Sequence, residues 1–590
     1  MTKLYLTRLD YSQKKSGNIF ALGLWCLSKN ELHDFPDVNN NILSYIAGSN
    51  NNILISNQEV KVAYEKILPY LAEQLNTIHE QSLSKKFWSV LVGYWLMQYL
   101  GVLHNRYQIL VNAHEKVPNA QVFLIPSNNE WIATDTDEYS TGLFSDRLNH
   151  QLFGQIIRVR KLFQIEDLNG LVNNNIERIG RKPGSENLKR TVFFLSCLFG
   201  KFNKVVFVRS YLPKKLVFKL SLKFFSIPIL GTPKLKFVAE KIDIQKRNFL
   251  GSKLPIEATD FECLAMELLP KNIPTIFVEK LPNLLRIANY LRPKKAKVFI
   301  TANAFSSQEI YKVWAGNALS DVGGAHVILQ HGANYGQSKV YSDEDFETGS
   351  CSAFFTYGWR NKFKKNVFSL VASAKLGGIG AYQNNVPISN PEGDVLWVLA
   401  SFPRFQYTQW TAPQGPEFLK YLNEQGLFLK SLSPIVKKKI ICRPYMYDYG
   451  WGDLQFIKML GGTFQCDLKR KPLQGLIKKA NLTVFSYNST SVMEAMALNA
   501  PTICFWDSKA WEWRSEAMSI LKKLQEVGIY HDGAESAVAF INKRFLLNDL
   551  DKWWQSSSVQ NAREVYCRNY ANTGDNEYEQ WSLKIKEWLG

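Results

Sequence analysis

Residues 481–506, NLTVFSYNSTSVMEAMALNAPTICFW, decide the predicted fold. The first seven and the last six residues are rich in β-branched and aromatic side chains, which predicts two buried strands. Between them, residues 493–498 are strong helix formers, and Ser491 and Glu494 have the spacing of a capping box. The stretch therefore predicts strand, polar loop, short helix and strand, the repeating unit of a parallel α/β sheet.

The polar loop between the first strand and the helix predicts a phosphate site. Asn488, Ser489, Thr490 and Ser491 follow one another where the strand turns into the helix. The start of a helix offers free backbone N–H groups and the positive end of the helix dipole, and both favour a phosphate group. An ordinary capped helix of an α/β unit is the alternative, and this stretch alone does not separate the two.

A histidine follows another predicted strand. Residues 297–301 and 325–330 have the pattern of strands, and residues 306–318 between them have that of a helix, which predicts parallel βαβ units. His331 and Gly332 come directly after the second strand, at the edge where α/β sheets bind ligands. An imidazole at this edge suits a base or a hydrogen-bonding group for phosphate or sugar. The alternative is a histidine with a structural role.

Length and charge limit the class of protein. A chain of 590 residues is too long for one core, so two large domains, or three, are expected. The formal net charge of +19 indicates an anionic partner, such as a nucleotide, a nucleic acid, an acidic glycan or an anionic lipid surface. The basic residues are dispersed and no motif for binding DNA or RNA is present, so no nucleic-acid partner is expected.

Cysteine and histidine spacing predicts no metal site. The eight cysteines are scattered and the eight histidines lack metal-ligand spacing, which is typical of reduced thiols in a cytosol. The first residues lack the apolar core of a signal peptide. Residues 87–103 are apolar but fall short of the roughly 20 residues that span a bilayer, so a buried helix is expected. His104 and Arg106 are expected at the end of this segment. They would either face a site or only interact favourably with the helix dipole.

The basic region at residues 181–250 leaves two interpretations open. It mixes lysines with large apolar residues, which suits the surface of an anionic membrane or a lipid-linked acceptor. Alternatively, residues 215–225, KLVFKLSLKFF, alternate well enough for an exposed edge strand with outward lysines. The predicted location is cytoplasmic, and peripheral contact with the inner face of the cytoplasmic membrane is left open.

A stretch rich in Gly, Asn and Pro, residues 371–393, predicts a domain boundary. We place an N-terminal domain at 1–380, a hinge at 381–393 and a C-terminal α/β domain at 394–590. In the C-terminal domain, Arg404 lies in the loop after the first predicted strand. Arg443 ends the second strand and is followed by Trp451. Arginine can bind phosphate with both arms of its guanidinium group, and an aromatic ring can stack on a base.

Several motifs together carry a family resemblance. In chain order they are LGLWCL (22–27), FWSVLVGYWL (87–96), FSDRLNHQLF (144–153), LQHGANYG (329–336), FFTYGWR (354–360), EAMALNAP (494–501) and the pair Trp553-Trp554. In this order they resemble the LIC12162-type transferases of bacterial surface-carbohydrate biosynthesis, including O-antigen-like glycans, and EAMALNAP is similar to a signature of GT-B glycosyltransferases. The resemblance implies an α/β, GT-B-like fold with two doubly wound Rossmann-type domains facing a cleft, the N-terminal one enlarged by helical insertions.

The resemblance also implies roles for particular residues. Glu494 would bind the ribose of the nucleotide-sugar, although Asn499 replaces the usual glycine of the signature and Ser486 replaces an earlier acid. Glu347, in an acidic run otherwise expected to form a solvated loop, best matches the family pattern for the group that deprotonates the acceptor, and His331 is the other candidate for this catalytic base.

The predicted activity is transfer of a sugar from a nucleotide-sugar donor to a cell-surface glycan or lipid-linked glycan acceptor. The residues expected to bind the donor are Arg404, Arg443, Ser489, Thr490, Ser491 and Glu494. The sequence lacks a carboxylate pair of the DxD type at a strand edge, so the helix dipole and basic side chains, and no metal or other cofactor, are expected to stabilise the leaving group. The alternatives are a CDP-polyol phosphotransferase and a non-catalytic protein that binds nucleotide, carbohydrate or nucleic acid.

Overall fold

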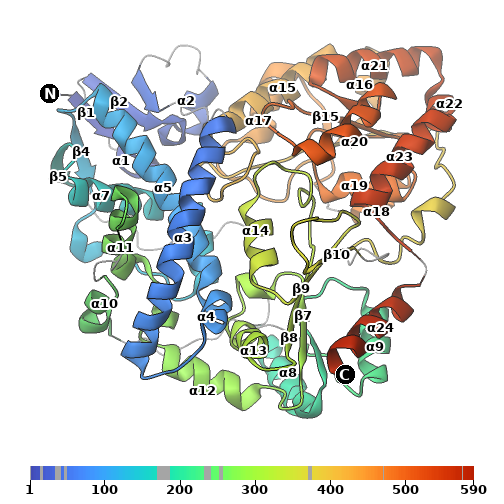
Figure 1. Ribbon diagram of the computed structural model, residues 1–590. Coiled ribbons are helices and arrows are strands. Elements are labelled where there is room, and N and C mark those ends of the chain that lie inside the picture. Colours follow the sequence, from blue (N-terminus) through green and yellow to red (C-terminus); the bar gives the residue numbers. More distant parts are fainter. Residues whose placement is uncertain are drawn as a thin grey trace.

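Three parallel β-sheets organise the chain (Figure 1). The computed structural model describes residues 2–12, 18–33, 41–44, 50–168, 186–230, 241–251, 257–369, 375–468, 471–574 and 576–590. The first sheet has the strand order β3-β2-β1-β4-β5. Its strands are β1 (Thr2–Tyr5), β2 (Asn18–Gly23), β3 (Ile42–Ser44), β4 (Gln121–Leu124) and β5 (Gln164–Asp167).

The middle sheet has its strands in sequential order, β10-β9-β8-β7-β6. They are β6 (Val205–Phe207), β7 (Val298–Thr301), β8 (Ala325–Leu329), β9 (Ala353–Thr356) and β10 (Val367–Ser369). Strands β7, β8 and β9 are buried along their whole length, which explains their nearly continuous apolar sequences. Residues 1–380, predicted as one N-terminal domain, thus contain two sheets, and the proposed division at 381–393 stays a prediction.

The C-terminal sheet has the strand order β13-β12-β11-β14-β15-β16. Its strands are β11 (Val395–Val398), β12 (Ile440–Arg443), β13 (Gln465–Cys466), β14 (Leu482–Phe485), β15 (Thr502–Phe505) and β16 (Tyr530–His531). Numbered by appearance, this is 3-2-1-4-5-6, the order of a doubly wound Rossmann-type sheet. The chain reverses direction across the sheet between β11 and β14, so the loops that leave these two strands flank the crevice where such sheets bind ligands.

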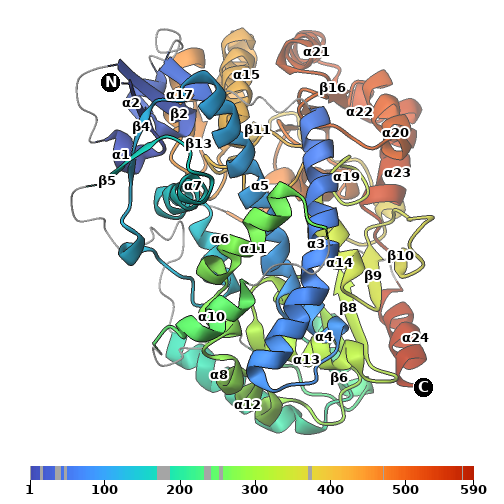
Figure 2. The ribbon, with the colours of Figure 1, turned by 60° about the vertical axis from the view of Figure 1, so that its left-hand side comes forward.

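Helices pack around all three sheets. In the part before the C-terminal sheet they are α1 (Arg8–Tyr11), α2 (Lys29–His33), α3 (Asn50–His79), α4 (Lys85–Leu91), α5 (Gly93–Lys116), α6 (Thr136–Gly142), α7 (Asp146–Arg160), α8 (Glu186–Phe199), α9 (Lys214–Lys223), α10 (Ile244–Leu250), α11 (Asp260–Asn272), α12 (Leu281–Leu291), α13 (Glu309–Ser320) and α14 (Ser342–Gly349). Helices α3 and α5 pack against each other, and α3 lies on the face turned to the viewer in both views (Figures 1 and 2).

The C-terminal part adds ten helices within the described residues. They are α15 (Phe418–Ser431), α16 (Pro434–Lys439), α17 (Asp453–Gly461), α18 (Leu473–Ile477), α19 (Thr490–Ala497), α20 (Ser515–Glu526), α21 (Ala534–Leu547), α22 (Leu550–Trp554), α23 (Ser557–Tyr570) and α24 (Glu577–Leu589). The last helix leaves the C-terminal sheet and packs on the middle sheet, beside α9 (Figure 1). There Trp581 and Phe355 have ring centroids 5.1 Å apart, which ties the end of the chain to the middle sheet.

The apolar segment at residues 87–103 lies inside the protein, as predicted. Trp88, Trp95 and Tyr99 on α4 and α5 are completely buried. In the residues that the structure describes, no helix has both the length and the apolar composition needed to cross a bilayer. His104 and Arg106, expected at the end of this segment, instead lie in the middle of α5 and are buried.

Two further expectations about local structure are wrong. Residues 215–225 do not form an edge strand, because most of them belong to α9, whose buried residues Leu216 and Leu220 have the i, i+4 spacing of a helix face. The acidic run that ends at Glu347 is not a solvated loop but helix α14, in which Glu347 is buried. Short segments of this kind fit both the helix and the strand or loop pattern, and packing decides between them.

Candidate functional site

The turn after β8 and the start of α19 contact each other. The backbone N–H of Ala333 donates a hydrogen bond to Thr490 Oγ1 at 3.1 Å. Asn488 Nδ2 donates to Asn334 Oδ1 and to Gln337 Oε1, each at 3.0 Å. The structure thus brings together the two turns that the sequence singled out, through polar contacts and not through packed aliphatic side chains.

Parallel topology explains this meeting. Each turn follows the carboxyl end of a buried strand, β8 in the middle sheet and β14 at the point where the C-terminal sheet reverses. Ser489 is the N-cap residue of α19, in extended backbone conformation, so the helix begins earlier than the predicted capping box at Ser491. Ser491 therefore lies in the first turn of the helix. The buried Oγ of Ser489 has no hydrogen-bond partner among the described residues, which leaves a hydroxyl beside the helix start.

His331 is connected to Glu347 through Tyr335. The Tyr335 hydroxyl donates to Glu347 Oε1 at 2.7 Å and lies 3.1 Å from His331 Nδ1. Because the tyrosine has one proton and donates it to the carboxyl group, its oxygen can accept a hydrogen from the imidazole, and Nδ1 is the nearer ring nitrogen, with Nε2 at 3.4 Å. With the hydrogen on Nδ1, Nε2 is unprotonated, which is the state required of a general base.

Burial controls the charge of this group of side chains. It lowers the pKa of His331 to about 4, and the nearby positive charge of Lys375 adds to the effect. Burial, together with the negative charge of Asp343, raises the pKa of Glu347 well above its usual range. The imidazole is therefore neutral at pH 7. Its side chain is 25 % exposed whereas that of Glu347 is 1 % exposed, so only the histidine can meet a substrate directly.

Glu494 and His331 share an electrostatic neighbour, Lys375. Burial raises the pKa of the Glu494 carboxyl group, while the Lys375 ammonium group and a hydrogen bond from Gln474 lower it. Lys375 thus acts electrostatically on both His331 and Glu494. Sequence reasoning missed Lys375, because it falls in the stretch interpreted as a linker. It also missed Tyr335, whose only signal is its place four residues after His331.

Arg404 lies in the loop after β11, as predicted, but its guanidinium group is already occupied. Nη1 donates to the Trp25 carbonyl oxygen at 2.6 Å, and Nη2 forms an ion pair with Asp146. Arg404 is buried, and both partners belong to the part of the chain that forms the first sheet. In this structure Arg404 therefore joins the C-terminal sheet to the first sheet and does not present a free fork to a phosphate.

Arg443 also has a partner. It ends β12 and forms an ion pair with Asp467, which follows β13. Strand β11 separates β12 from β14, so Arg443 and Thr490 share the carboxyl edge of the C-terminal sheet without being neighbours. Trp451, expected to stack on a base, is completely buried and donates its indole N–H to the Phe402 carbonyl oxygen at 3.0 Å. It is a core residue, so the stacking role is wrong.

Metal-binding side chains do not gather in the described part of the chain. Among these residues no three or more His, Cys, Asp or Glu side chains lie close enough to hold a metal ion. The positive groups that the structure does place at the site are the N-terminus of α19 and Lys375. They are suited to a negatively charged ligand.

Comparison with known proteins identifies the family. Residues 2–585 match the family described as LIC12162 family transferase. No curated protein matches the chain.

Proposed function

The chain belongs to the LIC12162 family of transferases, and we propose that it is a metal-independent, GT-B-like glycosyltransferase. It transfers a sugar from a nucleotide-sugar to a cell-surface glycan or lipid-linked glycan. One observation carries the proposal: the turn that holds His331 is hydrogen-bonded to the start of α19 through Ala333 and Thr490. A base for the acceptor and an anion-binding helix start thus belong to one site.

The donor is proposed to bind to the C-terminal sheet. Its phosphates lie against the start of α19, where the first backbone N–H groups of the helix and the residues Ser489, Thr490 and Ser491 are found. Lys375 supplies a positive charge for the departing phosphate. Glu494 binds the ribose. The doubly wound order of the C-terminal sheet supports this placement, because such sheets bind nucleotides where the strand order reverses.

The acceptor hydroxyl is proposed to lose its proton to His331. Its Nε2 takes the proton as the oxygen attacks the sugar carbon, and the bond from that carbon to the donor phosphate breaks with its electrons leaving on phosphate. The imidazolium that forms keeps the Tyr335 oxygen as an acceptor, and Tyr335 is held in place by Glu347, whose Oε2 is 3.8 Å from His331 Nδ1. His331 is thus the catalytic base, and Glu347 acts through Tyr335 as a positioning residue.

Product analysis tests the proposal. Purified protein is incubated with UDP-, GDP-, dTDP- and CMP-sugars and with CDP-glycerol, and the released nucleotide is identified by chromatography. Release from a nucleotide-sugar that stops in the His331→Ala variant supports sugar transfer. Release of CMP from CDP-glycerol alone would establish the polyol phosphotransferase instead. Failure of every donor to bind or react would leave a non-catalytic binding protein.

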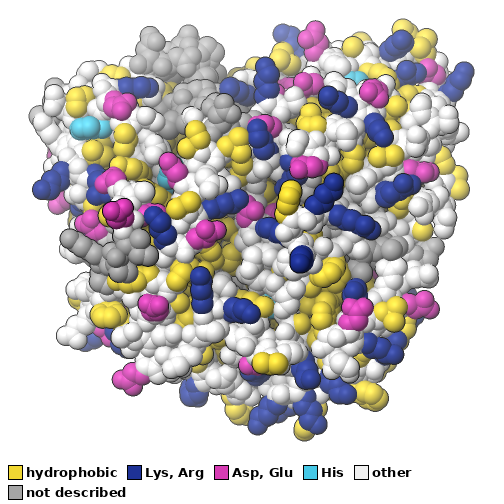
Figure 3. All heavy atoms as spheres, viewed as in Figure 1, with side chains coloured by type: hydrophobic (Ala, Val, Ile, Leu, Met, Phe, Trp, Pro, Cys, Tyr) yellow, Lys and Arg dark blue, Asp and Glu magenta, His cyan; other side chains and the backbone are white. Residues whose placement is uncertain are grey.

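A peripheral contact with an anionic membrane from the cytoplasmic side is part of the proposal. Helices α8 and α9 and the turns after them expose large apolar side chains, among them Phe199, Phe202 and Phe225, the last 81 % exposed. Lysines alternate with them, and Figure 3 shows blue and yellow side chains together along the lower edge, where Figure 1 places these helices. Apolar side chains ringed by lysines favour the interface of an anionic bilayer.

A further inference from the structure

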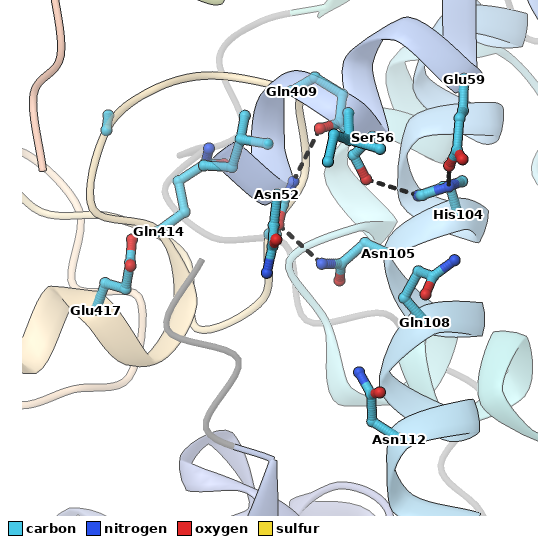
Figure 4. Close-up of a pocket in the computed structure, with 14 residues that line it drawn as sticks. Asn52, Ser56, Glu59, His104, Asn105, Gln108, Asn112, Gln409, Gln414 and Glu417 are labelled. Atoms are coloured by element: carbon cyan, nitrogen blue, oxygen red, sulfur yellow. Dashed lines mark hydrogen bonds and ion pairs between the residues drawn. The ribbon is translucent and has the colours of Figure 1, made fainter. Parts of the chain in front are cut away.

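We propose that the cavity between α3, α5 and the loop at residues 405–417 binds a neutral sugar unit of the acceptor. The inference rests on the proposed function and names the substrate class that this cavity takes. The cavity has a volume of about 390 Å³. Figure 4 shows its walls, with α5 on one side and the loop that precedes α15 on the other.

The lining is polar but lacks positive charge. Seven of the fourteen lining residues are Asn or Gln, two are Glu, and none is Lys or Arg. A phosphate or another anion finds no counter-charge from Lys or Arg here and would be repelled by the Glu59 carboxylate and by the ionised form of Glu417. Amide, hydroxyl and carboxylate groups instead match the many hydroxyls of a sugar, each of which both donates and accepts hydrogen bonds. The cavity therefore complements the anion site at α19 and does not duplicate it.

Three amide side chains of α5 form one wall of the cavity. Asn105, Gln108 and Asn112 are spaced i, i+3 and i+7 along α5, so their amide groups lie on one face of the helix and line the cavity. Gln108 and Asn112 are exposed. Asn105 is fixed by a hydrogen bond of 2.8 Å from its Nδ2 to Gln406 Oε1, which also ties the loop to the helix. The amides therefore form a ready-made row for hydroxyl groups.

Two residues of α3 and one of α5 form a hydrogen-bonded chain in the cavity wall (Figure 4). His104 Nε2 lies 2.6 Å from Glu59 Oε2, and His104 Nδ1 lies 2.8 Å from Ser56 Oγ. Burial lowers the pKa of His104, so the ring is neutral at pH 7. The Nε2 hydrogen then points at the carboxylate, Nδ1 accepts the Ser56 proton, and the Ser56 oxygen keeps lone pairs for a ligand hydroxyl.

The loop wall adds a buried acceptor without a partner. Gln414 is 7 % exposed, and its Nε2 donates to the carbonyl oxygens of Thr408 and Trp410 at 3.2 and 3.1 Å. Its Oε1 has no hydrogen-bond partner among the described residues. A buried amide oxygen without a donor is costly, and a sugar hydroxyl in the cavity would supply that donor.

The cavity is joined to the candidate catalytic helix. The backbone N–H of Ser342, the first residue of α14, donates to the carbonyl oxygen of Gln409 at 3.0 Å. Gln409 lines the cavity, and α14 carries Glu347. The loop therefore connects the cavity wall to the relay that holds His331, as expected if the acceptor chain extends from this cavity toward the base.

Ligand-observed NMR tests the inference directly. Saturation-transfer spectra are recorded with methyl glycosides of glucose, galactose, mannose and N-acetylglucosamine, and with inorganic phosphate, added to the full-length protein. At least one glycoside is expected to bind and phosphate is not expected to compete with it. In the double variant Gln108→Ala/Asn112→Ala the dissociation constant of that glycoside rises at least tenfold. Gln58→Ala, which removes an exposed amide on α3 outside the cavity lining, leaves that dissociation constant unchanged.

The outcomes separate this inference from the proposed function. Nucleotide binding with no glycoside binding, or glycoside binding that the double variant leaves unaltered, overturns the cavity assignment and leaves the proposed function standing. Glycoside binding lost in the double variant, with no nucleotide binding, supports the cavity and overturns the transferase mechanism. Because both substituted residues are exposed, an unchanged melting temperature is expected and shows that the variant is folded.

Discussion

Replacing Tyr335 by Phe tests the relay that links His331 to Glu347. The change removes a single oxygen, which donates to Glu347 Oε1 at 2.7 Å and lies 3.1 Å from His331 Nδ1. Without it, the imidazolium formed during proton transfer loses the hydrogen-bond acceptor that the Tyr335 oxygen provides. A hydrogen bond to a charged group contributes about 1.5–3 kcal/mol, so kcat should fall roughly 10- to 150-fold while KM for the donor stays close to that of the wild type.

The same change has a cost in stability. Glu347 is 1 % exposed, and its Oε1 would lose the Tyr335 donor. An unsatisfied buried polar group costs about 1–3 kcal/mol, which urea denaturation can measure. Tyr139→Phe is the matched control, because Tyr139 is also buried and its hydroxyl has no partner among the described residues. An unchanged kcat in Tyr335→Phe, or an equal loss in Tyr139→Phe, would refute the relay.

Three further predictions concern the interface between sheets, the cavity and the membrane. Arg404→Met removes the ion pair with Asp146 and should lower the free energy of unfolding by about 3–5 kcal/mol, as measured in urea; a loss below about 1 kcal/mol would contradict the buried pair. Burial raises the pKa of Glu417 to about 7, so the folded protein holds the Glu417 proton more tightly than the unfolded chain does. The stability that this protonation contributes is fully present below about pH 4.5 and is lost as the pH rises through about 7. Glu417→Gln should therefore remove a decline of up to about 3 kcal/mol between pH 4.5 and pH 8, seen as a flatter dependence of stability on pH. The double variant Phe202→Ser/Phe225→Ser should lose co-sedimentation with vesicles rich in phosphatidylglycerol, and wild-type protein that ignores such vesicles would rule the contact out.

Much of the fold follows from local pattern. The strand, helix and strand in residues 481–506 were predictable because both strands are buried and give continuous apolar runs, and β11, β7 and β8 follow the same logic. Short strands such as β13 and β16, two residues each, carry no pattern of their own. The sorting of strands into three sheets was not predictable either, since it depends on pairing between distant segments.

The site was predictable only in part, for a related reason. His331 and Thr490 each come shortly after a buried strand, and in a parallel sheet the residues that follow the strands lie at the carboxyl edge. No local sequence pattern shows which carboxylate an arginine pairs with. Arg404 finds Asp146, which is 258 residues away in the sequence, and Arg443 finds Asp467 on the neighbouring strand end. Lys375 belongs to a stretch with the composition of a linker, and that composition does not single out one lysine as part of the site.

Nucleotide binding in a Lys375→Ala variant tests the anion site most directly. A thermal-shift panel of UDP, GDP, CMP, CDP and dTDP on the wild type should identify one ligand, which at about a hundred times its Kd stabilises the fold by roughly 2.7 kcal/mol. Loss of the Lys375 charge should weaken that ligand roughly 10- to 150-fold. Lys522→Ala, an exposed lysine on α20, should bind as the wild type does. If no nucleotide stabilises the protein, or if the two lysine variants bind it equally well, the start of α19 with Lys375 is not the donor site.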